Sequence, residues 1–133
     1  MKDYTIQYIF SASSLIFSYI FGNCNTILIC LLLIMLLDYA TGILQAIYNK
    51  NLNSHVGYKG IIKKILILIF VGLANLIDKS LGVEMCRNIV IFFYIANESL
   101  SIIENFAKCD MIVPKKIVIL LEQLRDKNDK EEE

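Results

Sequence analysis

The sequence predicts an all-α integral membrane protein with three to four transmembrane helices, a short amphipathic C-terminal helix and a charged tail. Of its 133 residues, 56% are hydrophobic and 20% are charged, and the mean hydropathy is +0.58. Soluble domains are nearer 45–50% apolar and about 25% charged. The run from Tyr4 to Leu37 contains no charged side chain. As one helix it would measure about 51 Å, against a hydrocarbon core of about 30 Å, so it contains more than one helix.

The first hydrophobic segment, residues 4–21, ends at a cluster of turn-forming residues from Gly22 to Asn25. Because it contains glutamine, threonine and several serines, it either spans the membrane or lies in the interface. The second segment, residues 26–48, opens with an unbroken apolar run from Ile27 to Leu37. Its length and composition predict a membrane-spanning helix.

Two further helices are expected at residues 60–81 and 86–107, after a polar, glycine-containing loop at 49–59. Pro114 is expected to open a short helix, because proline suits the first turn of a helix. The apolar residues of that helix lie on one face and are Ile117, Leu120, Leu121 and Leu124. The last residues, 125–133, are almost all charged and are expected to fray. Residues 1–133 are thus expected to form a single membrane domain.

Basic residues are concentrated on one side of the expected topology. Residues 49–64 contain four lysines and the tail from 108 to 133 contains six basic residues, whereas the turn at 22–25 contains none. The positive-inside rule therefore places the 49–64 region and the C-terminus in the cytoplasm. Four spans with both termini inside is the simplest arrangement. Three spans with an interfacial first helix is the alternative.

Three of the expected helices carry a stripe of polar residues, and these residues are the candidates for a pore-lining or subunit-facing surface. They are Asp38, Thr41, Gly42, Gln45, Lys64, Asn75, Asp78, Asn97, Glu98, Ser101, Glu104 and Asn105. A charged group facing lipid at the bilayer centre costs at least ~2.5–3.5 kcal/mol. We expect one small bundle to be unable to satisfy all the stripes, which predicts a homo-oligomer around a water-filled passage. For helix 86–107, a solvated face at an interfacial helix end is the alternative.

Several classes of function have no support in the sequence. Thirteen basic and thirteen acidic residues give zero formal net charge, so bulk attraction to nucleic acid is not expected. The four cysteines form no CxxC pair and His55 is the only histidine, so neither a metal site nor a cofactor is expected. No order of nucleophile, base and acid suggests an enzyme. The lipid bilayer is the expected partner.

A series of spaced motifs resembles the toxin-secretion/phage-lysis holin family. Residues 37–42, LDYATG, resemble its DYxTG signature, and Ser54 with residues 57–64, GYKGIIKK, resembles its S-x-x-G-x-KGI-x-KK element. Residues 94–105, YIANESLSIIEN, resemble its NE-x-LS-I-x-EN element. Several motifs in the right order are far more specific than one motif alone.

Two single positions extend the resemblance, which covers roughly residues 26–124. Asp78 matches the next acidic position of the family, and Pro114 stands where the family has a proline. The chain departs from the family in having Cys109 and Asp110 in place of the usual Leu-Gly.

The resemblance implies a holin, which is not an enzyme. Such proteins oligomerise in the bacterial cytoplasmic membrane and form lesions that release a passive cargo, either an endolysin or a large toxin. A small four-helix membrane transporter remains an alternative, although it usually has a carboxylate in its first helix and residues 4–21 have none. An ion-conducting subunit and a structural scaffold are further alternatives.

Overall fold

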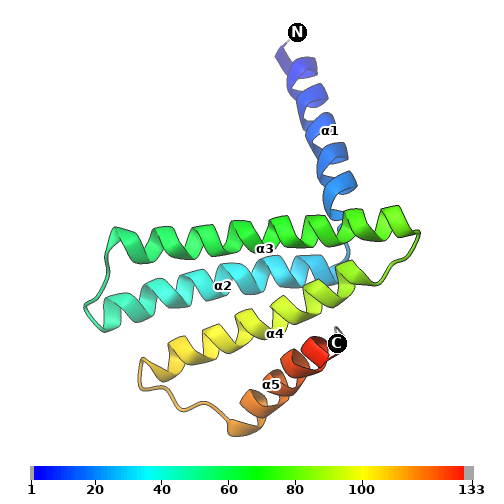
Figure 1. Cartoon of the computed structure of the whole chain (residues 1–133). Coiled ribbons are helices and arrows are strands. Elements are labelled where there is room, and N and C mark those ends of the chain that lie inside the picture. Colours follow the sequence, from blue (N-terminus) through cyan, green and yellow to red (C-terminus); the bar gives the residue numbers. More distant parts are fainter. Residues whose placement is uncertain (1, 131–133) are drawn as a thin grey trace.

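The computed structural model describes residues 2–130, which form five α-helices and no strand (Figure 1). In chain order they are α1 (Lys2–Phe21), α2 (Thr26–Tyr48), α3 (Ser54–Leu81), α4 (Cys86–Ala107) and α5 (Lys115–Lys130). The prediction of an all-α protein is therefore confirmed. By length and composition, α2, α3 and α4 are the described helices able to cross a membrane.

Helix α3 begins at Ser54, six residues before the start expected from the sequence. The side chain of Asn53 accepts a hydrogen bond from the backbone N–H of Val56 at 2.9 Å and so caps the first turn. The polar segment expected to be a loop thus supplies the first two turns of the helix. Helix α5 continues to Lys130, into the segment expected to fray, and residues 131–133 lie outside the described part of the chain.

Helices α2, α3 and α4 lie side by side and share one apolar core (Figure 1). Its fully buried members include Leu31 of α2, Val71 of α3 and Ile91 of α4. The outer faces of these helices expose many large apolar side chains, such as Leu36 and Leu73. Hydrocarbon around the bundle would give these exposed side chains apolar surroundings.

Helix α1 projects away from the bundle, crosswise to α2–α4, and only its C-terminal end is near them (Figure 1). Its backbone packs mainly beside α3, and Arg87 of α4 also donates a hydrogen bond to the carbonyl oxygen of its last residue, Phe21. Apolar and aromatic residues such as Tyr8, Phe10 and Leu15 are more than 70% exposed along it. By length and composition, helix α1 is not one of the described helices able to cross a membrane.

Helix α5 turns back beside α4 and, of the described helices, packs only against α4 (Figure 1). The link before it contains Asp110 in a left-handed conformation, with φ 61°. The Tyr48 hydroxyl donates to Asp110 Oδ2 at 3.1 Å, and Asn49 Nδ2 donates to the carbonyl oxygen of Lys108 at 3.2 Å. These contacts fix the end of α4 against the end of α2.

Candidate functional site

Lys64 of α3 joins two carboxylates from the other two helices of the bundle. Its Nζ lies 2.6 Å from Asp38 Oδ2 of α2 and 2.6 Å from Glu98 Oε2 of α4. All three side chains are well buried, and Glu98 is completely inaccessible. One ammonium group thus connects α2, α3 and α4 inside the bundle.

Lys63 completes the charge balance of this site. Its Nζ lies 2.8 Å from Glu98 Oε1, the second oxygen of the same carboxylate, while its side chain is 45% exposed. Two ammonium groups therefore face two carboxylates. We call Asp38, Lys63, Lys64 and Glu98 the inner ion network. Its neutrality matters because an uncompensated charge in a low-dielectric interior is strongly unfavourable.

Asn105 and Thr41 extend the inner ion network toward the ends of α2 and α4. Asn105 Nδ2 donates to Thr41 Oγ1 at 3.1 Å and to Asp38 Oδ1 at 3.5 Å. The Thr41 hydroxyl in turn donates to the carbonyl oxygen of Asp38 at 3.1 Å. Asp38 therefore has partners on both carboxylate oxygens, as a buried carboxylate requires.

Glycine at position 60 lets α2 and α3 approach closely beside the inner ion network. A Cβ atom there would lie 3.2–3.3 Å from two ring carbons of Tyr39. Most side chains at position 60 would push the Tyr39 ring away and widen the gap between the helices. The DYxTG and KGI-x-KK segments thus meet at Tyr39 and Gly60 as well as at Asp38 and Lys64.

A second polar cluster lies at the opposite end of the bundle and centres on Arg87, the second residue of α4. Arg87 Nε donates to the carbonyl oxygen of Phe21 at 2.6 Å, and one terminal nitrogen donates to that of Asn23 at 2.8 Å. Asp78 of α3 accepts hydrogen bonds from the backbone N–H groups of Cys86 and Arg87, both at 2.9 Å. Asp78 therefore caps the start of α4.

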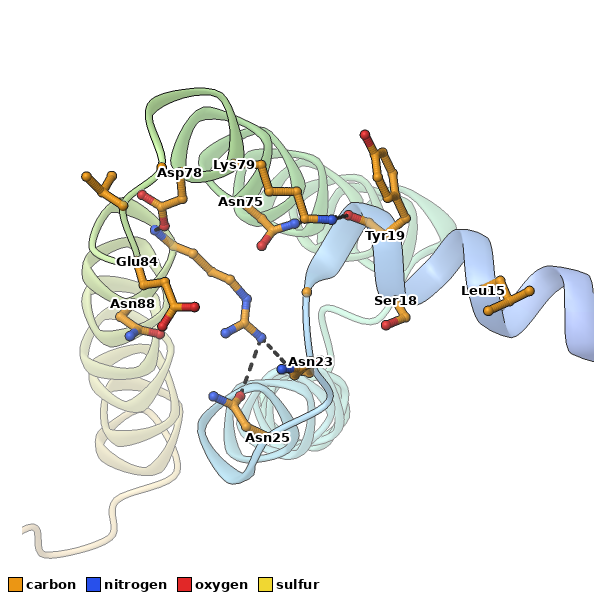
Figure 2. A pocket seen from close by; sticks show the side chains of 14 residues that line it. Leu15, Ser18, Tyr19, Asn23, Asn25, Asn75, Asp78, Lys79, Glu84 and Asn88 are labelled. Carbon is orange, nitrogen blue, oxygen red and sulfur yellow. Dashed lines mark hydrogen bonds between the residues drawn. The ribbon is translucent and has the colours of Figure 1, made fainter.

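Asn75 and Lys79 of α3 hold the end of α1 in the same cluster (Figure 2). Asn75 Nδ2 donates to the carbonyl oxygens of Tyr19 at 3.1 Å and Ile20 at 2.7 Å, and Lys79 Nζ donates to that of Tyr19 at 2.5 Å. The last carbonyl groups of a helix have no partner within it. Asn75, Lys79 and Arg87 supply these partners, and Asp78 holds the start of α4 beside them. We call Asn75, Asp78, Lys79 and Arg87 the α1 anchor.

The structure distributes the twelve candidate residues over several environments. Those that belong to the inner ion network, form hydrogen bonds that extend it, or line the cavity beside it are Asp38, Thr41, Gly42, Gln45, Lys64, Ser101, Asn105 and Glu98. Asn75 and Asp78 belong to the α1 anchor instead. Asn97 is partly buried and Glu104 is exposed.

Glu98 and Glu104 do not share surroundings, although both belong to the polar stripe of α4. Glu98 is fully buried between two lysines, whereas Glu104 is exposed. Many polar side chains of the stripes find partners within a single chain. This differs from the expectation that one small bundle could not satisfy them, and the reason is that Lys63 and Lys64 lie opposite the carboxylates of the neighbouring helices.

The sequence patterns did not indicate the roles of Lys63 and Arg87. Lys63 enters the sequence analysis as one of the four lysines at 49–64 and as part of the GYKGIIKK motif, and Arg87 belongs to none of the polar stripes. The sequence does contain a signal for Arg87. A basic residue in the first turn of an apolar helix needs a hydrogen-bond acceptor, and Asp78 lies only nine residues before it. Among the described residues no cluster of histidine, cysteine and carboxylate side chains could hold a metal ion.

The chain matches the model of the bacteriophage holin family over residues 15–126. It is 43% identical over 119 residues to an uncharacterized protein of Listeria monocytogenes, covering 87% of this chain and 85% of that one. A "Probable holin" of Bacillus phage phi105 is 32% identical over 117 residues, covering 87% and 86% of the two chains.

A third relative is an uncharacterized 14.9 kDa protein of Clostridium perfringens, which is 40% identical over 114 residues and covers 84% of this chain and 86% of its own. No solved structure matches the fold. The family match extends from the end of α1 through all three candidate spans and into α5. The chain therefore belongs to the bacteriophage holin family.

Proposed function

We propose that this protein is a holin whose copies gather in the bacterial cytoplasmic membrane and open lesions through which an endolysin or a large toxin leaves passively. Membership of the holin family and the similarity to a protein named "Probable holin" support this function. The proposed activity is physical rather than enzymatic. The whole chain acts as one membrane domain, with the segment after α4 in the cytoplasm.

The inner ion network is the observation that carries the proposal of a wet lesion. Polar and charged side chains are concentrated where α2, α3 and α4 face one another, while the outer faces expose apolar side chains. A single chain in this state has its polar surface closed off from lipid. When several copies assemble, separation of α4 from α2 and α3 would turn the same side chains toward water, which can replace their partners.

Induced expression in bacteria tests this function. We expect the membrane potential, followed with a voltage-sensitive dye, to collapse abruptly and growth to stop at the same moment. Crosslinking in the membrane before the collapse should give species larger than a dimer. A small transporter or ion-conducting subunit would change the potential gradually with expression level. Crosslinking that gives only monomer in cells that have stopped growing would contradict the lesion.

Cysteine labelling tests the proposed topology. In a variant lacking the four native cysteines, Ser54→Cys at the start of α3 should resist a membrane-impermeant thiol reagent applied to intact cells. Val83→Cys in the α3–α4 connection is the matched control, because position 83 is exposed at the opposite end of the bundle. It should be labelled from outside. Labelling of position 54 together with protection of position 83 would reverse the proposed orientation.

A further inference from the structure

A cavity of about 650 Å³ lies at the end of the bundle where α2 and α4 end and α3 begins, at the left in Figure 1. Four lysines line it, namely Lys59, Lys63, Lys64 and Lys108. We propose that this cavity binds the phosphate headgroup of an anionic phospholipid. The inference rests on the membrane placement proposed above and does not depend on lesion opening.

The charges around the cavity do not balance within the chain. Lys63 and Lys64 are paired with Glu98 and Asp38 in the inner ion network. Lys59 and Lys108 are exposed, and neither forms an ion pair with any side chain that the structure describes. The cavity therefore presents two ammonium groups without a counterion. His55 and Val56 in the first turn of α3 also line it.

We expect the two unpaired lysines to lie close to the level of the lipid phosphates. Helix α3 has 28 residues and is about 42 Å long, so it is longer than the hydrocarbon core of about 30 Å. Its first turns therefore extend into the headgroup region when the bundle spans the membrane. Lys59 lies in the second turn of α3, and Lys108 directly follows the last residue of α4. A lipid phosphate can therefore reach both ammonium groups while it stays in the headgroup region.

The remaining walls of the cavity favour a lipid over a free anion. Ile43, Val56 and the ring of Tyr39 line it beside the lysines. An apolar wall next to basic groups suits a ligand that joins a phosphate to glycerol and acyl chains, whereas inorganic phosphate gains nothing from it. Basic pockets between transmembrane helices on the cytoplasmic side are known to hold anionic headgroups. The positive-inside topology puts this end of the bundle at that leaflet.

Lipid retention by the purified full-length chain tests the inference. In detergent, native mass spectrometry should detect phosphatidylglycerol bound to the wild type in preference to zwitterionic phosphatidylcholine. The double variant Lys59→Gln/Lys108→Gln should lower the affinity for phosphatidylglycerol about thirtyfold, because each lysine near an anionic lipid contributes about fivefold. Its weak retention of phosphatidylcholine should not change.

Lys115→Gln/Lys116→Gln is the matched control, since it removes the same charge from exposed positions on α5 outside the cavity. This variant should keep phosphatidylglycerol as the wild type does. Equal losses in both double variants, or no loss in Lys59→Gln/Lys108→Gln, would overturn the inference. Displacement of the lipid by an equal concentration of inorganic phosphate would also overturn it and assign a free-anion site. Should the cavity double variant misfold, each single variant is expected to lose about fivefold.

Discussion

Replacing Lys64 with methionine is expected to destabilise the protein by about 3–5 kcal/mol, the usual cost of removing one partner from a buried ion pair. The change leaves Asp38 without its ammonium partner, and Glu98 keeps only Lys63. Methionine fills a similar volume, so the lost stability is attributable to the missing charge rather than to an empty cavity. Thermal unfolding in detergent, followed by size-exclusion chromatography of the heated samples, measures the effect.

Two further variants distinguish the loss of charge pairing from a non-specific effect of substitution on stability. Asp38→Asn/Lys64→Met/Glu98→Gln removes the three buried charges together and should recover most of the lost stability. Lys63 keeps its charge in this variant, but its side chain is 45% exposed, so water can solvate it. Lys116→Met removes one exposed lysine of α5 and should leave the unfolding temperature unchanged. If Lys64→Met unfolds at the same temperature as Lys116→Met, the inner ion network does not hold the three helices together.

Replacing Gly22 with alanine is expected to cost roughly 3 kcal/mol and to release the end of α1 from the bundle. Gly22 has φ +76°, and a Cβ there would lie 2.7 Å from Asn75 Oδ1 and 3.1 Å from Arg87 Nε. The left-handed conformation alone costs an alanine roughly 1–2 kcal/mol. Displacing the side chains of Asn75 and Arg87 adds about 1–3 kcal/mol, the cost of leaving one carbonyl group of α1 without a partner.

Gly82→Ala is the matched control for this prediction. Gly82 also has a left-handed φ, +67°, but nothing lies within 4 Å of its added Cβ. It should therefore cost only the backbone term, roughly 1–2 kcal/mol. Hydrogen–deuterium exchange should accelerate at residues 19–25 in Gly22→Ala and stay unchanged there in Gly82→Ala. Equal exchange at residues 19–25 in the two variants would mean that the α1 anchor does not depend on the space at Gly22.

Many helix boundaries followed from signals within a few residues. The turn cluster at 22–25 separates α1 from α2, and Pro114 precedes α5, because these residues limit the local backbone directly. The start of α3 was placed six residues too late. Its first turns are polar and include glycine, so hydropathy gave no helix signal there. Asn53 is a residue type that often caps helices, but the polar composition of residues 54–59 favoured a loop over a helix.

The polar stripes show a second limit of prediction from sequence, which is that a pattern does not identify the partner of a buried charge. Helical periodicity grouped Glu98 with Glu104, yet the two lie at opposite edges of the stripe on α4, and the bundle buries one and leaves the other exposed. A buried carboxylate must have a partner, but water, another subunit and a lysine from a neighbouring helix all meet that need. Sequence periodicity therefore indicates that a partner exists without identifying it.

The amino-acid sequence is sufficient to predict that this protein is helical, that at least three of its helices suit a membrane, and that it carries motifs resembling those of the holin family. Those properties depend on hydropathy, helix length and residues close together in the chain. Only the tertiary structure paired Lys64 with Asp38 and Glu98, which are 26 and 34 residues away, and tied Arg87 to carbonyl groups more than 60 residues before it. These pairings depend on how each helix is rotated against its neighbours, and that rotation is set by the packing of the whole bundle.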